Sequence, residues 1–284
     1  MSTVEEDADG AEERYRPDDV LVFDASATAA HFKRAEGNSA SQTYRVPPRT
    51  TVTGLVSGIV GHPYDSYYDL FRRSNSAIAV VPRSTLRTQT QAYLHVNTGD
   101  QNQHVVNVGP DDAFRIPRTW GDDRKPQREP YALLFDVEYR FVVGIEDDAT
   151  YSALRQALET RRYEYTPCLG RRECGAAIEY RGEHAVEHAV ETTTLTSALP
   201  VSALDGEHGV MLAVQDDGQV IDTERSPAEQ KADGLDDPGR SSMRHTIRWE
   251  TWTVPRDGGN LRLSRPIEAA RIALDDGDET VAFA

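Results

Sequence analysis

The sequence is poor in lysine. Only Lys33, Lys125 and Lys231 are lysines, so arginine supplies 28 of the 31 basic residues, and 47 acidic residues bring the formal net charge to −16. An acid excess with arginine in place of lysine is typical of proteins from a salt-rich cytosol, where a dense carboxylate surface keeps a chain hydrated. An ordinary acidic protein is the alternative interpretation of this composition.

The sequence also lacks the features of exported and membrane-bound proteins. It has only two cysteines, which argues against a disulfide framework. No segment approaches the roughly 18 consecutive apolar residues of a membrane span. The acidic start MSTVEEDADGAEER has no basic region followed by an apolar stretch, as a signal peptide would have. We therefore expect a cytoplasmic protein without membrane contact, in which residues 1–18 form a disordered acidic tail.

Positive charge is concentrated in one part of this acidic chain. Residues 30–99 contain three acidic residues and eight basic ones, a local net charge of +5; the bases are Lys33, Arg34, Arg45, Arg49, Arg72, Arg73, Arg83 and Arg87. A local positive field in a negative protein indicates an anionic partner, most simply a nucleic acid. The alternative is that these arginines pair with acidic residues of the C-terminal half.

The first part of the chain predicts a β-α-β unit. A strand at 19–25 precedes a helix that starts near Pro48, presents Leu55, Val56, Ile59 and Val60 on one face, and stops at Gly61. A second strand is predicted at 76–82.

A second β-α-β unit follows. The alternating strand at 131–145 turns Val137, Tyr139 and Phe141 to one side, a helix begins after Asp147 or Asp148, and a short strand covers 176–180. Two such units predict an α+β fold. We expect a ferredoxin-like domain at 19–181, with a four-stranded antiparallel sheet and two helices on one face, an arrangement shared with the RRM.

Residues 83–130 interrupt this domain where only a turn is needed. The alternating segment 85–96, the turn 97–103 and the return strand 104–108 predict a long β-hairpin that projects from the sheet with an Arg-, Gln- and Tyr-bearing face. A hairpin with a merely solvated polar side is the alternative. Long insertions of this kind are usually functional or disordered, and the alternation argues against disorder.

Residues 182–284 predict a smaller β-rich subdomain. Strands are expected near 192–200, 209–215, 243–254 and 279–284. The polar segment 222–242 is expected to be a mobile loop.

Two motifs resemble the Cas-five RAMP family of type I CRISPR surveillance complexes. The first is HFKR at 31–34 followed by YRVPPRTTVTG at 44–54, which is similar to the family's aromatic–x–x–Pro-Pro helix start. The second is YTPCLGRREC at 165–174, which is similar to its Pro-x-Leu-Gly turn. The resemblance spans roughly residues 20–180, and the acidic, lysine-poor composition suits a haloarchaeal type I-B member.

The resemblance implies a role in antiviral defence. Such subunits cap the 5′ handle of the CRISPR guide RNA (crRNA), which they hold between the RAMP domain and the projecting hairpin, or thumb. They also contact the Cas-seven-type backbone subunit and the Cas-eight-type large subunit. The resemblance therefore implies a non-catalytic Cascade subunit that is not an obligate homo-oligomer and needs no cofactor or metal.

Handle capping needs phosphate neutralisation, hydrogen-bond donors and flat surfaces for unpaired bases. At the helix start, Arg45, Arg49, Thr50 and Thr51 are candidates for holding a phosphate at the positive end of the helix dipole. The alternative there is a proline-started helix that its threonines merely cap. Candidate RNA-binding residues elsewhere are His31, Lys33, Arg34 and Tyr44, the hairpin residues Arg83, Arg87, Gln91 and Tyr93, and the turn residues Gly170, Arg171 and Arg172, with Phe32 as a weaker stacking candidate. The turn could equally be a simple helix-ending turn.

Two other functions are open. One branch of the family cleaves repeat RNA with a tyrosine and a Lys-His pair; this chain has no Lys-His dipeptide, and only His31, Lys33 and Tyr44 could form a substitute site. Cys168, Cys174, His184 and His188 have a spacing loosely similar to that of a zinc finger. We expect no zinc, because both gaps are unusual and the two histidines fit neighbours on a short helical turn.

Overall fold

The computed structural model of the chain describes residues 14–34, 42–95, 103–107, 113–117, 127–204, 218–233 and 243–284. Several predictions fall outside these ranges: the tail at 1–13, most of the hairpin turn at 97–103, the strand at 209–215, and residues 234–242 of the predicted loop. The backbone N–H of Tyr15 donates to the carbonyl of Arg73 at 2.9 Å. The prediction of a disordered tail is therefore wrong for residues 15–18, which continue into the first strand.

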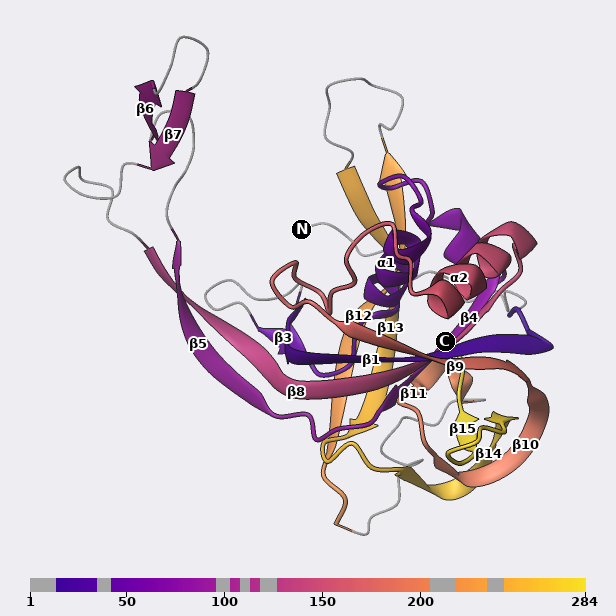
Figure 1. Cartoon of the computed structure of the whole chain (residues 1–284). Coiled ribbons are helices and arrows are strands. Elements are labelled where there is room, and N and C mark those ends of the chain that lie inside the picture. The colour runs from indigo at the N-terminus through magenta and orange to yellow at the C-terminus, as the bar shows by residue number, and fades with distance from the viewer. Residues whose placement is uncertain are drawn as a thin grey trace.

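The centre of the molecule is an antiparallel sheet of β1 (Asp19–Ala30), β4 (Ser76–Pro82), β8 (Gln127–Ile145) and β9 (Ala177–Ala185). The strand order is β4-β8-β1-β9 (Figure 1). Phe23 of β1 pairs with Phe141 of β8 on one side and with Tyr180 of β9 on the other. The four predicted strands are confirmed, although three of them are longer than predicted.

Both predicted helices are confirmed and lie on the same side of this sheet (Figure 1). Helix α1 (Arg49–Val60) ends at Gly61, whose φ of 92° is a left-handed conformation that glycine adopts without strain. Helix α2 (Asp148–Thr160) is capped by Asp147, whose side chain accepts from Thr150 N at 2.8 Å. A 3-10 turn, η1 (Asp69–Phe71), leads into β4.

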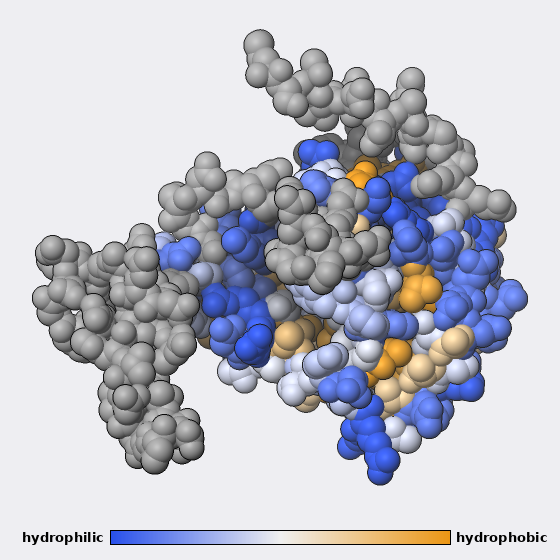
Figure 2. Space-filling model, turned by 90° about the horizontal axis from the view of Figure 1, so that it is seen from above, coloured by the Kyte–Doolittle hydropathy of each residue, from blue (hydrophilic) through white to orange (hydrophobic). Residues whose placement is uncertain are grey.

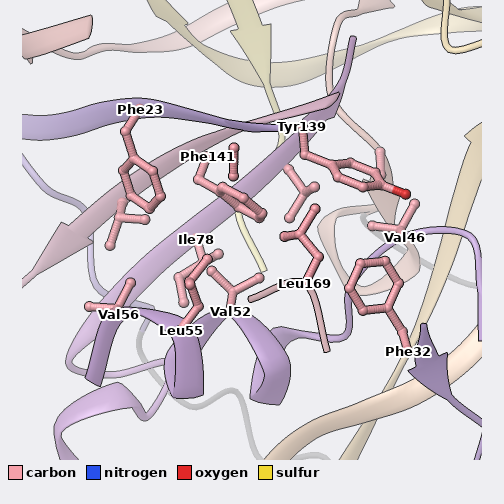
Figure 3. Close-up of a cluster of buried hydrophobic side chains, with 14 of the residues drawn as sticks. Phe23, Phe32, Val46, Val52, Leu55, Val56, Ile78, Tyr139, Phe141 and Leu169 are labelled. Carbon is pink, nitrogen blue, oxygen red and sulfur yellow. The ribbon is translucent and has the colours of Figure 1, made fainter. Parts of the chain in front are cut away.

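The main core lies between the sheet and α1. Figure 3 shows Phe23 and Phe141 from the sheet facing Val52 and Leu55 from α1, and all four side chains are buried. The predicted inward side of β8 is confirmed, because Val137, Tyr139, Phe141 and Val143 all belong to this core. Each fully buried side chain of this size stabilises the fold by about 1.5–3 kcal/mol.

The opposite face of the sheet is covered as well. β10 (Glu187–Leu195), β14 (Leu261–Ile272) and β15 (Glu279–Val281) form a second sheet there. Ala270, Ile272 and Val281 pack against Val22 and Val142 of the central sheet. Arg140 points to this face and is buried among three carboxylates, Asp24, Asp276 and Glu279, at 2.7–2.8 Å.

The insertion forms an arm, but its strands pair differently from the prediction. β5 (Thr88–His95) pairs with the N-terminal half of the long strand β8, and Gln91 lies opposite Tyr131. The predicted return strand is β6 (Gln103–Asn107), which instead pairs with β7 (Ala113–Pro117). The β5–β8 pair projects from the body of the molecule (Figure 1).

The prediction of a mobile loop at 222–242 is wrong for residues up to Asp233. These residues form β12 (Ile221–Asp233), which pairs with β13 (Met243–Pro255) and through it with β11 (Leu199–Pro200). The strand was missed because its buried positions include Glu224 and Glu229, whose carboxylates pair with arginines, so apolar residues do not alternate along it.

The C-terminal strands share the main core. Trp252 and Val254 of β13 belong to the same hydrophobic cluster as Phe23, and the predicted boundary after Arg181 lies inside β9. The remaining short elements are β2 (Phe32–Lys33), β3 (Thr43–Tyr44) and the 3-10 turn η3 (Val201–Ala203).

The outer surface is polar. The face in Figure 2 is mainly hydrophilic, and its hydrophobic residues form limited patches between charged and polar ones. Within the described ranges, no helix combines the length and the apolar composition that a membrane crossing needs.

Candidate nucleic-acid interface

A groove of about 650 Å³ opens at the start of α1. Its walls come from the end of β1 with β2, the first turns of α1, the turn at 165–171, and the strand pair β12–β13. None of the described residues that line it is Asp or Glu, although the chain has 47 acidic residues. The groove therefore offers an anion a path free of like charge. The predicted site residues that line it are His31, Lys33, Thr50, Thr51, Gly170 and Arg171.

The positive end of α1 faces this groove. The N-cap residue is Pro48, which supplies no side-chain cap, and the first turn contains no acidic residue. Thr50 and Thr51 are both partly exposed, and the Thr50 hydroxyl donates to the carbonyl of Pro227 at 3.4 Å. The N–H groups of Thr51 and Val52 both donate to the carbonyl of Pro48, at 2.8 and 3.1 Å, so the hydroxyls and the positive end of the helix, without a counter-charge, are what suits a phosphate group here.

His31 lies at the end of β1 with its ring buried. Nδ1 is 2.8 Å from the carbonyl oxygen of Ala132. Because a carbonyl only accepts, Nδ1 carries the proton and Nε2 is an acceptor, which has no partner among the described residues. Burial lowers the pKa of His31 more than the bond to Ala132 raises it, and nearby Arg171 and Lys33 lower it further. The imidazole is therefore neutral at pH 7.

Arg171 lines the groove and also contacts the aromatic residues at the base of the β5–β8 arm. Its guanidinium lies 4.4 Å from the ring centre of Tyr131 and 5.6 Å from that of Tyr93, and the two rings are 5.2 Å apart in an edge-to-face arrangement. The His31 ring is 5.4 Å from Tyr131 in the same manner. Arg171 also contacts Glu173 at 3.3 Å and remains 28% exposed.

Gly170 fixes the turn that carries Arg171. Its φ is +87°, and a Cβ on this residue would lie 2.0 Å from the carbonyl oxygen of His31. The His31 N–H in turn donates to the carbonyl of Leu169 at 3.2 Å. The turn and the end of β1 are thus held in direct backbone contact, which only glycine allows.

Other predicted residues are exposed near this region or along the arm. Lys33 and Arg172 are exposed, as are Arg87 and Gln91 at the start of the arm, and Tyr93 is 37% exposed. Within the described ranges, none of Lys33, Arg87 and Arg172 forms an ion pair with a carboxylate.

Arg49 is buried in the interior and does not line the groove, contrary to the predicted position facing RNA. Its side chain is fully buried, and its guanidinium donates to the backbone oxygens of Ala284 (3.1 Å), Ser76 (3.0 Å) and Phe71, and to Ser76 Oγ (2.7 Å). Burial lowers its pKa to about 10, which still leaves it charged at pH 7. Arg49 ties α1 to β4 and to residue 284.

Arg45 and Arg34 also face inward. Arg45 contacts Asp222 at 2.7 Å and the carbonyl of Leu86 at 2.8 Å, and its backbone N–H donates to Glu224. Arg34 lies 3.7 Å from Glu224 and 5.2 Å from the ring centre of Tyr44. The alternative interpretation of the basic segment, pairing with C-terminal acidic residues, is correct for these two arginines and also for Arg72, which contacts Glu229, and Arg83, which contacts Glu279.

Arg83 and Tyr44 lie away from the groove. Arg83 contacts Glu279 at 3.2 Å and lines a separate cavity of about 320 Å³ with Asp276 and Asp278. Tyr44 is only 1% exposed, so its ring is not available for stacking on a base, and Phe32 is equally buried. The burial of Tyr44 also removes it from the substitute cleavage site with His31 and Lys33.

The four candidate zinc ligands do not come together. Among the described residues there is no group of three His, Cys, Asp or Glu side chains suited to a metal ion. His184 Nε2 contacts the carbonyl of Arg181 at 3.1 Å, and His188 Nε2 contacts that of Pro17 at 2.8 Å. The two histidines lie on β9 and β10, so the prediction of a helical turn is wrong.

Two aromatic residues of the site were missed by the sequence reasoning. No pattern in the sequence indicated a role for Tyr131, because its position beside Arg171 depends on the pairing of β5 with β8. Tyr165 lines the groove and is 63% exposed. Its position at the start of the quoted YTPCLGRREC motif was the signal that could have identified it.

Comparisons with known proteins support one family. The family described as CRISPR-associated protein (Cas_Cas5) matches residues 20–252. None of the curated proteins matches the chain.

Three solved structures resemble the chain at low identity. A chain of a CRISPR RNA-guided surveillance complex is 13% identical, with 86% of this chain and 91% of that one covered and a TM-score of 0.45. A CRISPR protein from Archaeoglobus fulgidus is 12% identical, with 94% and 100% covered and a TM-score of 0.49. A chain of the type III-B Cmr-beta complex bound to cognate target RNA and AMPPnP is 11% identical, with 86% of both chains covered and a TM-score of 0.38.

Proposed function

The chain belongs to the CRISPR-associated Cas5 family, and from that premise we propose that it holds the 5′ handle of a crRNA in the acid-free groove at the start of α1. In this proposal it is a non-catalytic subunit of a type I surveillance complex. The observation that carries the proposal is the groove itself, because a chain with 47 acidic residues keeps every one of them out of the described lining.

The arrangement of the fold supports the same role. In this proposal the strand order β4-β8-β1-β9, with α1 and α2 on one side, is a ferredoxin-like domain, and β5 with the outer half of β8 serves as the thumb. We propose that RNA leaves the groove past Arg171 and Tyr131 and follows the arm, where Arg87, Gln91 and Tyr93 are exposed.

In this proposal, different residues of the site contact different chemical groups of the RNA. Lys33, Arg171 and the start of α1 suit phosphate oxygens, which position the strand but carry little sequence information. Hydroxyl groups of the lining, such as those of Thr51 and Thr166, suit 2′-hydroxyls and base edges, which distinguish RNA from DNA and one base from another. At molar salt the Debye length is about 3 Å, so affinity then depends on direct contacts and stacking rather than on long-range attraction.

The partners that we propose are the crRNA handle and the backbone and large subunits of the complex. The test is to purify a tagged copy from its host at high salt and sequence the RNA that comes with it. We expect RNAs that share one repeat-derived 5′ end, together with other complex subunits. Heterogeneous RNA, or none, would refute the capping role.

Single substitutions then locate the site. In binding assays with the co-purified 5′ sequence, Lys33→Gln and Arg171→Gln should each weaken binding at least about fivefold and reduce the salt slope by about 0.7. The control is Arg271→Gln on β14, which removes an arginine that is 44% exposed, against 28% for Arg171, and lies on the other side of the central sheet. Equal losses in all three variants would contradict the groove.

Metal-independent RNA cleavage is the second candidate function. One observation favours it: His31 is neutral and lines the groove, and its buried Nε2 could act as a general base only after a local movement that opens it to the RNA. Purified protein incubated with its repeat RNA in a chelator decides the matter. Cleavage that His31→Ala abolishes would overturn the non-catalytic assignment.

A further inference from the structure

Tyr165 is exposed in a way that its packing does not require. Large hydrophobic side chains in the described part of the chain are mostly buried, yet 63% of Tyr165 is open to solvent. Tyr165 also lines the acid-free groove. An aromatic ring that is open to solvent beside Lys33 and Arg171 is accessible to a ligand that enters the groove.

The backbone of Tyr165 is held firmly while its ring is free. Its N–H donates to the carbonyl of Gly58 in α1 at 3.1 Å, and the preceding N–H, of Glu164, donates to Ile59 at 3.1 Å. Two residues later, the carbonyl of Pro167 accepts from Ala176 at 2.9 Å. The bonds of Glu164 and Tyr165 attach this segment to the side of α1, so the helix fixes the position of the Tyr165 backbone, from which the ring extends.

We propose that Tyr165 is a stacking platform for one unpaired nucleobase of the RNA in the groove. This inference rests on the proposed function and adds the class of ligand group that the rim of the groove takes. A tyrosine on a fixed backbone has only two side-chain torsions to restrict, so it presents a flat face at low entropic cost. The positive start of α1, with Thr51 and Lys33 on the same groove, would hold the phosphate of the same nucleotide.

A nucleobase fits the neighbourhood better than an apolar side chain of a protein partner. The lining combines cations, hydroxyls and the Gln230 amide, which together match a phosphate, a sugar and the polar edge of a base. Every base has a π-face, so stacking by Tyr165 should contribute affinity with little sequence preference.

Direct binding measurements test this inference. The probe is a labelled single-stranded RNA with the 5′ sequence of the co-purified guide, and the variants are Tyr165→Ala, Tyr165→Phe and Tyr64→Ala. Tyr64 is the matched control, because it is 73% exposed and does not line the groove. We expect Tyr165→Ala to weaken binding about 5- to 150-fold, and Tyr165→Phe and Tyr64→Ala to bind like the wild type.

A second set of probes identifies the base. Each probe carries one abasic nucleotide at a different position. At one position, the missing base should weaken binding of the probe to the wild type. The same probe should bind the Tyr165→Ala variant as well as the intact RNA does, because that variant has already lost the stacking contact. The loss should persist at high salt, because stacking is not screened, whereas the loss in Lys33→Gln should shrink. Thermal melts of each variant confirm folding.

The outcomes separate the two proposals. If the wild type binds the probe and Tyr165→Ala binds equally well, or if no abasic position weakens the wild type, the stacking role is refuted and the groove assignment stands. If the wild type binds no RNA and none co-purifies, both proposals are refuted.

Discussion

Arg49→Met distinguishes a structural arginine from an RNA-binding one. The Arg49 guanidinium makes four hydrogen bonds, to the backbone oxygens of Phe71, Ser76 and Ala284 and to Ser76 Oγ, and it is fully buried. Methionine has a similar length but no donor, so these acceptors would stay buried without a partner. Sequence alone favours the opposite role, at the mouth of the helix facing RNA.

The magnitude follows from two opposing terms. Four buried acceptors that lose their donor cost about 1–3 kcal/mol each. Removing the charge also removes the cost of burying it. Burial lowers the pKa of Arg49 from 12.5 to about 10, which corresponds to a burial cost of about 3 kcal/mol. The acceptors together cost about 4–12 kcal/mol, so the net loss in the free energy of unfolding is about 1–9 kcal/mol, a range that includes the cost of breaking a buried ion pair. At about 2 °C per kcal/mol for a chain of this length, that lowers Tm by roughly 2–18 °C.

The assay combines stability and binding at one salt concentration. Thermal unfolding followed by circular dichroism gives Tm, and RNA affinity is measured at a temperature where the variant is still folded. Arg271→Met on β14 is the control and should stay within about 0.5 kcal/mol of the wild type, because its side chain is 44% exposed. If Arg49→Met kept its Tm and lost RNA affinity, the structural role of Arg49 would be refuted.

The other predictions concern the turn and the histidine beside the groove. Gly170→Ala should lower stability by at least about 1–3 kcal/mol and weaken RNA binding, because its Cβ would lie 2.0 Å from the His31 carbonyl; Gly218→Ala, with a φ of +84° and open space around it, measures the backbone strain alone. His31 should make the protein less stable as the pH falls below about 6.5, since burial lowers its pKa and only the unfolded chain then takes up the proton readily. The midpoints of urea unfolding at pH 7.5 and pH 5.5 measure this effect. The difference between the two midpoints should be smaller in His31→Gln than in the wild type. An equal difference in both proteins would contradict the prediction.

The sequence predicts well what depends on neighbours along the chain. Helix α1, its stop at Gly61 and the cap of α2 by Asp147 are set by local spacing and capping chemistry, and all three are confirmed. Each of the two motifs that flank the groove is also local, and between them they contain His31, Lys33, Thr51 and Arg171, which all line it.

What depends on distant partners could not be predicted. Arg49 is three residues before Val52 and seven before Val56, a spacing that places it on the buried face of α1. Its charge nevertheless favoured the prediction of an exposed position. The inward carboxylates of β12 gave that segment the composition of a loop, and their arginine partners lie more than 150 residues away. The cluster of Tyr131 with Arg171 needed the pairing of β5 with β8, which the sequence did not reveal.

The pairing of Arg45 with β12 has a consequence for how the protein is made. The backbone N–H of Arg45 donates to the carboxylate of Glu224, 179 residues further along the chain. At 5–20 residues per second, a ribosome needs roughly 10–35 s to add that stretch. Throughout this interval the arginines behind the groove lack their internal carboxylates, and the nascent chain presents a cationic segment to any RNA nearby. If the groove binds RNA as proposed, we expect RNA encountered on the ribosome to compete with β12 for these arginines.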